Sequence, residues 1–181
     1  MPFSLLIIMA DAWLQDMYYE HGVILRVVSA LKRLPARIEN ENALPQAVLG
    51  DFLEVITNFA DRCHHGKEEQ TLFPLLGKKR PENRKMINTL LKEHAVGRDF
   101  VELMKSESKS KVIAGAVGYA DMIPKHIRKE TAFFLEAAPT LSKTEKDRLS
   151  EEFKRIEKKV IGEGKHEEYL QLVKKVEEST N

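Results

Sequence analysis

Histidine and glutamate residues spaced four positions apart are the most distinctive chemical feature of this 181-residue sequence. The pattern His-x-x-x-Glu occurs at His64/Glu68, His65/Glu69 and His126/Glu130. The first two occurrences are neighbouring registers of a single His-His doublet. Residues four apart lie one turn apart on the same helical face. Each pair can therefore present a nitrogen and a carboxylate oxygen to a common point, as a metal site requires.

Two more histidines, His21 and His94, lie on otherwise apolar faces of predicted helices. Their apolar neighbours, at steps of mostly three or four, are Leu14, Met17, Ile24 and Val28 for the first and Ile87, Leu91 and Val101 for the second. The same periodicity directs Glu69 and Glu130 toward the interior, where an unpaired carboxylate is costly. Neutral imidazoles supply no cation to balance these acids, so bound metal ions would satisfy both kinds of residue.

The donor set consists of nitrogen and oxygen atoms only. Cys63 is the single cysteine, so an internal disulfide, a thiolate zinc site and an iron–sulfur cluster are excluded. Four histidines and two glutamates suit iron, with manganese also possible. The two carboxylates partly balance two divalent ions, and six protein donors leave coordination positions open for dioxygen, nitric oxide or peroxide.

The elements that must position these residues are helices. Apolar residues recur at three- and four-residue steps along almost the whole chain, which predicts an all-α protein. The predicted helices span about residues 10–34, 45–76, 81–105, 111–137, 142–161 and 165–178. The first helix is predicted to end before Pro35, a loop to cover 35–44, and the second helix to begin at Pro45 and end at Gly77. We also expect a kink at Pro124, a capping box formed by Ser142 and Glu145, and helix breaks at Gly162 and Gly164.

Four long helices with short connections imply an up-down four-helix bundle. We assign this bundle to residues 1–140, and two additional C-terminal helices in residues 141–181 to an appendage packed on it. Antiparallel neighbours would bring His65, His94 and His126 to similar heights. The first helix fits less well, by about two turns, unless the 35–44 loop lets the second helix overhang.

Composition narrows the classes of function. A net charge of +1 argues against a dedicated nucleic-acid binder, which needs a basic face. The longest apolar run, Leu5 to Ala10, is far shorter than the roughly 18 residues of a membrane span. A secretory signal needs a basic stretch before its apolar run, and no Lys or Arg precedes Arg26, so we expect a cytoplasmic protein without nucleic-acid or membrane partners.

Taken in order, the histidines and glutamates resemble the pattern of the hemerythrin-like HHE cation-binding domain family. The local contexts that carry the resemblance are 61–74 (DRCHHGKEEQTLFP), 91–98 (LKEHAVGR) and 124–134 (PKHIRKETAFF). The resemblance covers about residues 12–170 and implies a carboxylate-bridged non-haem di-iron centre, with two iron ions, in a four-helix bundle. The ligands that it implies are His21, His65, Glu69, His94, His126 and Glu130.

The doublet leaves a question of register within this resemblance. We favour His65/Glu69 over His64/Glu68 because Leu72 and Phe73 follow Glu69 at the family's spacing. His64 would then support a ligand or face solvent. The fifth histidine of dioxygen-carrying hemerythrins has no clear counterpart in the bundle, which argues against reversible oxygen transport. His166 falls outside the pattern and is interpreted as a surface or packing residue.

Three hypotheses for function follow. The first is a di-iron protein that binds dioxygen, nitric oxide or peroxide in a sensing, storage or protective role. The second is a redox enzyme that consumes peroxide or handles nitric oxide at the same centre, which peroxide turnover by wild type and His65→Ala would distinguish. The third is a metal-free helical interaction module, for which Glu69→Ala or Glu130→Ala would be neutral or stabilising.

Overall fold

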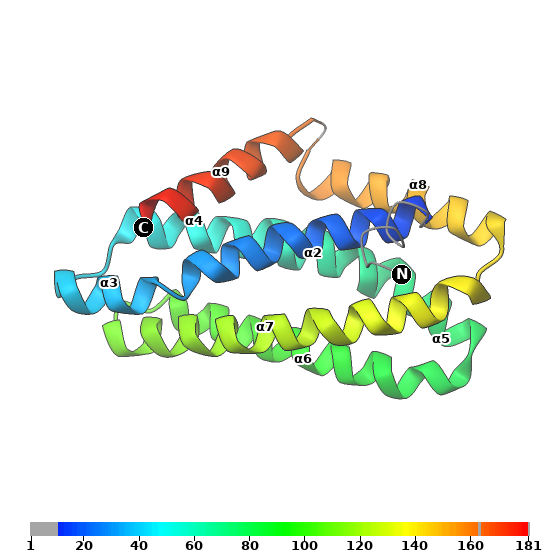
Figure 1. Ribbon diagram of the computed structural model, residues 1–181, viewed down its shortest axis with the longest axis horizontal. Helices are drawn as coiled ribbons and strands as arrows, with labels where there is room; N and C mark the ends of the chain where they lie inside the picture. The colour runs from blue at the N-terminus through cyan, green and yellow to red at the C-terminus, as the bar shows by residue number, and fades with distance from the viewer. Residues whose placement is uncertain (1–10, 163, 181) are drawn as a thin grey trace, which may run out of the picture.

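The computed structural model describes residues 11–162 and 164–180, and all regular structure within them is helical (Figure 1). The chain begins with α2 (Ala12–Leu31) and α3 (Leu34–Glu41). A long segment follows, made of α4 (Gln46–Glu54), η1 (Val55–His65), η2 (Glu68–Leu72) and α5 (Phe73–Lys79). The later helices are η3 (Pro81–Asn83), α6 (Arg84–Met104), α7 (Lys109–Ala137), η4 (Ala138–Thr140), α8 (Lys143–Val160) and α9 (His166–Ser179). None of these described helices has the length and apolar character needed to cross a membrane.

Four long segments lie alongside one another and alternate in direction in Figure 1: α2, the α4–α5 segment, α6 and α7. Helix α7 packs against both α6 and α2. Its approach to α6 depends on glycine, because a Cβ on Gly115 would lie 2.6 Å from the carbonyl oxygen of Phe100. Helices α8 and α9 cover the other side of the molecule, against α2 and the α4–α5 segment.

A layer of histidines and acids separates two apolar clusters along these segments. One cluster includes Trp13, Met17, Leu72, Leu90 and Phe134, and the other includes Val23, Val28, Phe59, Val101 and Ile127. On every long segment a histidine or glutamate lies between members of the two clusters. His21, for example, lies between Met17 and Val23. The apolar packing therefore fixes the polar residues of four segments at one height.

The helix boundaries confirm several sequence predictions and correct others. Ser142 and Glu145 form the predicted capping box, and the breaks at Gly162 and Gly164 are confirmed by positive φ angles of 100° and 75°. The predicted loop over 35–44 is wrong, since α3 occupies most of it with Pro35 in its first turn, a position that suits proline. Helix α5 also continues past Gly77 to Lys79.

Candidate metal centre

Both residues of the His64-His65 doublet face the interior, and the segment that carries them is π-helical. Segment η1 ends at His65, η2 begins at Glu68, and their i→i+5 hydrogen bonds put more residues into each turn than an α-helix holds. His64 is 1% exposed and His65 is 5% exposed. A solvent-facing position for His64 is therefore excluded, and the doublet contributes two imidazoles to the interior.

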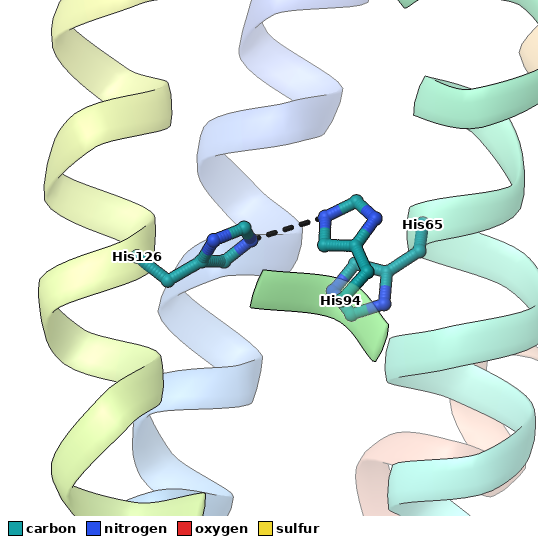
Figure 2. A group of neighbouring side chains, drawn as sticks. All are labelled: His65, His94 and His126. Atoms are coloured by element: carbon teal, nitrogen blue, oxygen red, sulfur yellow. Dashed lines mark hydrogen bonds between the residues drawn. The ribbon is translucent and has the colours of Figure 1, made fainter. Parts of the chain in front are cut away.

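Three histidines from three segments form the first group, shown in Figure 2: His65 from η1, His94 from α6 and His126 from α7. The Nε2 atoms of His94 and His126 lie 3.1 Å apart. The rings of His65 and His94 stack with their centroids 3.8 Å apart. One ring nitrogen of each residue lies within 4.8 Å of the others, which is close enough to share a metal ion.

A carboxylate forms a hydrogen bond with Nδ1, the outer ring nitrogen, of each histidine in this group. The pairs are His65 Nδ1 with Asp61 at 3.1 Å, His94 Nδ1 with Glu69 at 2.7 Å and His126 Nδ1 with Glu93 at 2.9 Å. A carboxylate can only accept a hydrogen bond, so each Nδ1 carries the proton and donates it. In the neutral ring Nε2 then has a lone pair that it can offer to a metal ion, which is the arrangement found around histidine ligands of metals.

The second group contains two histidines and two acids: His21, His64, Glu68 and Glu130. His21 Nε2 lies 3.2 Å from Glu130 Oε2, and His64 Nε2 lies 3.4 Å from Glu68 Oε1. The outer nitrogen of His64 is 2.8 Å from Glu20 Oε2, so this histidine is oriented in the same way as those of the first group.

Glu68 and Glu130 each extend from one group to the other. The two oxygens of Glu68 lie 3.4 Å from His64 Nε2 and 3.4 Å from His94 Nε2. Those of Glu130 lie 2.8 Å from His126 Nε2 and 3.2 Å from His21 Nε2. Each carboxylate thus offers one oxygen to each group, as a bridge between two metal ions would.

Five donor atoms in the second group are buried without a hydrogen-bond partner. They are His21 Nε2, His64 Nε2, both carboxylate oxygens of Glu68 and Glu130 Oε2. Their close approaches to one another lack hydrogen-bond geometry. Buried polar atoms are nearly always paired in proteins, so such a concentration requires an explanation. Metal coordination would explain it, because all five are metal-donor atoms, and each residue of the second group has a donor atom within 4.8 Å of those of the other three.

Burial sets the charge states in the absence of metal. It raises the pKa of Glu68 well above its usual range, and the negative charge of Glu130 adds to the effect. Burial favours the same change in Glu130, but three neighbouring histidines outweigh it and lower the pKa of that carboxyl. Burial also lowers the pKa of His65 to about 3, with a contribution from His94. The histidine is therefore neutral near pH 7 and able to bind a metal.

Glu69 lies at the rim of the site. The expectation that it faces the interior is wrong, since its side chain is 28% exposed and pairs with Arg98 Nη2 at 2.7 Å. The same guanidinium also binds Asp61, at 2.7 Å. Arg98 thereby joins the two carboxylates that orient His65 and His94. These three charged residues line a surface cavity of about 310 Å³.

The structure brings five of the six predicted site residues together. His65, His94 and His126 lie in the first group, and His21 and Glu130 in the second. Glu69 lies in neither group, whereas its neighbour Glu68 lies in the second. The ligand set favoured from the sequence left out His64 and Glu68, although these two residues also have the His-x-x-x-Glu spacing.

Two further consequences concern histidines. Together the two groups contain five interior histidines, one more than the four that the favoured ligand set includes. The side chain of His166 lies outside the described part of the structure. Glu20 and Glu93 directly precede His21 and His94 in the sequence, and each forms a hydrogen bond with Nδ1 of a histidine on a neighbouring segment. A Glu-His pair in the sequence could therefore have indicated these hydrogen-bond partners.

Comparison with protein-family models gives one match, to the family described as the hemerythrin HHE cation binding domain, over residues 14–138. The matched range contains all seven residues of the two groups. Comparisons with curated proteins and with solved structures give no significant match.

Proposed function

The chain belongs to the hemerythrin HHE cation-binding domain family, and on that premise we propose that it is a non-haem di-iron protein. His65, His94 and His126 would hold one ion, and His21 and His64 the other. Glu68 and Glu130 would bridge the two ions. The observation that carries this proposal is the convergence of five unpartnered, buried donor atoms from α2, α7 and the α4–α5 segment.

The donor set favours iron over the other common metals. Imidazole nitrogens with carboxylate oxygens and no thiolate suit iron, with manganese as the alternative. Paired iron ions held by histidines and carboxylates inside helical bundles form an established class of site. We extend the proposal to the architecture: residues 1–140 form the family's up-down four-helix bundle, and residues 141–181 are an appendage.

Bound iron would supply the binding of dioxygen, nitric oxide or peroxide, in a sensing, storage or protective role. The chain itself contributes orientation, because an acid fixes the outer nitrogen of four of the five histidines. It also contributes exclusion of water, because the apolar clusters lie on both sides of the polar layer. A metal-free interaction module would gain nothing from burying these unpaired donors.

Metal loading tests the proposal directly. Wild-type protein, reconstituted anaerobically with Fe(II) and desalted, should retain about two iron ions per chain. After oxidation, azide should change its visible absorption. Glu130→Gln removes a bridging donor and should lower the iron content, whereas Glu136→Gln makes the same chemical change at an exposed position of α7 and should not. Fewer than about one iron per chain in the wild type, with no visible bands, would overturn the proposal.

A further inference from the structure

Lys67 is a buried lysine beside the candidate metal centre, in the short gap between η1 and η2. Its side chain is 1% exposed. The ammonium group donates hydrogen bonds to Glu20 Oε1 and, over 2.9 Å, to Glu157 Oε2. Glu20 belongs to α2 and Glu157 to α8, so one buried cation joins three elements.

Glu20 connects this cation to the centre. One of its carboxylate oxygens binds Lys67, and the other lies 2.8 Å from His64 Nδ1. The contacts therefore run without a gap from His64 through Glu20 and Lys67 to Glu157. The last residue lies beyond the range 14–138 that matches the family, in the helix assigned to the appendage.

The charges of this chain of contacts depend on one another. A buried ammonium such as that of Lys67 is costly unless it is paired with acids. If Glu20 were its only partner, the full positive charge would act on that carboxylate and weaken it as the hydrogen-bond acceptor of His64. Glu157 shares the cation with Glu20. The nearby Cys63 cannot replace it, because burial raises the pKa of that thiol to about 12 and keeps it neutral.

The neighbourhood could also be mistaken for a separate metal site. Glu20, Cys63 and Glu157 have donor atoms within 4.8 Å of one another. Lys67 Nζ, however, already forms hydrogen bonds with both carboxylates. The cation that this group of acids binds is the lysine itself.

We propose that Glu157 is a positioning residue of the metal centre: acting through Lys67 and Glu20, it fixes the ring of His64. Helix α8, which lies in the proposed appendage, then supports the site. The effect on metal binding rests on the proposed function, whereas the effect on the ring is a property of the metal-free protein.

The first experiment uses metal-free, full-length protein and nitrogen NMR of the histidine side chains. Glu157→Gln should shift the ring signals of His64 and speed exchange of its Nδ1 proton, while those of His126 stay in place. Glu151→Gln makes the same change at an exposed position of α8, where the carboxylate pairs with Lys154, and should leave the ring signals of both histidines unchanged. Unchanged His64 signals in Glu157→Gln would overturn the proposal, whatever the metal content of the wild type.

The second experiment measures the rate of iron release to a chelator. Loss of partners outside the ligand set lowers metal affinity by about 10- to 100-fold, and for Glu157→Gln we expect about tenfold faster release. If Glu157 acts through Lys67, Lys67→Met and the double variant should release iron equally fast. Additive effects would contradict this route. Circular dichroism checks folding, and if Lys67→Met fails to fold, the NMR comparison decides. A wild type that holds no iron refutes the proposed function and leaves the NMR result to judge the positioning role.

Discussion

At the scale of single residues, burial distinguishes two neighbouring carboxylates. Glu68 and Glu69 are adjacent in the sequence, yet one is fully buried between the two histidine groups and the other lies at the rim. Arg98 accounts for the difference, because it binds Glu69 and holds that side chain outward while Glu69 still contacts His94. The same residue type therefore serves two different roles.

This difference predicts that two matched variants lose iron binding to different extents. Glu68→Gln removes a proposed bridging donor and should abolish binding of at least one iron ion. Glu69→Gln retains every proposed donor and weakens only the support of His94, so metal affinity should fall by about 10- to 100-fold while binding at high iron concentration remains. Titration with Fe(II) measures both. Loss of iron from Glu69→Gln alone would restore the register that the sequence favoured.

At the scale of elements, two features of helix geometry build the site. The segment that carries both inward-facing histidines of the doublet is π-helical in η1 and η2, and π-turns are frequent at functional sites. The close contact of α6 with α7 brings His94 within hydrogen-bond distance of His126. Gly115 permits this contact, because no other residue leaves room for the Phe100 carbonyl.

Two glycine variants should therefore change the free energy of unfolding in opposite directions. Gly115→Ala places a Cβ against backbone and should lower the free energy of unfolding by about 1–3 kcal/mol. Gly50→Ala, in α4, meets nothing within 4 Å and should raise it by about 0.5–1 kcal/mol, since alanine is the better helix former. Urea unfolding of the metal-free proteins measures both values. Equal stabilities would show that α6 and α7 tolerate a wider separation.

At the scale of the whole molecule, the polar layer lies between two apolar clusters that hold it at one height. The clusters draw on both the family-matched region and the C-terminal helices, since Phe153 of α8 belongs to one and Val173 of α9 to the other. The assignment of residues 141–181 to a separate appendage remains a prediction. Contacts of α8 with the apolar interior and with Lys67 show how closely it adjoins the site.

Metal binding should stabilise the folded chain as a whole, because the two groups draw donors from four segments. A ligand at 100 times its dissociation constant adds about 2.7 kcal/mol, which for a chain of this size corresponds to a Tm rise of about 5–10 °C. Anaerobic thermal unfolding with and without Fe(II) measures the rise. Mg²⁺, which prefers oxygen donors and retains its water, should have a much smaller effect. An unchanged Tm at saturating Fe(II) would contradict the proposed site.

The sequence alone determined the helical class, most helix positions and the types of donor, because these depend on local periodicity and on residue chemistry. It also indicated the family, through the order of histidines and glutamates. Only the tertiary structure decided that both histidines of the doublet and Glu68 are buried while Glu69 lies at the rim. Neighbouring residues of a helix point about 100° apart, so the sequence pattern alone does not say whether one or both of His64 and His65 face inward. The pairings of Glu69 with Arg98, of His64 with Glu20 and of Glu68 with His94 are contacts between different segments, which no local pattern specifies.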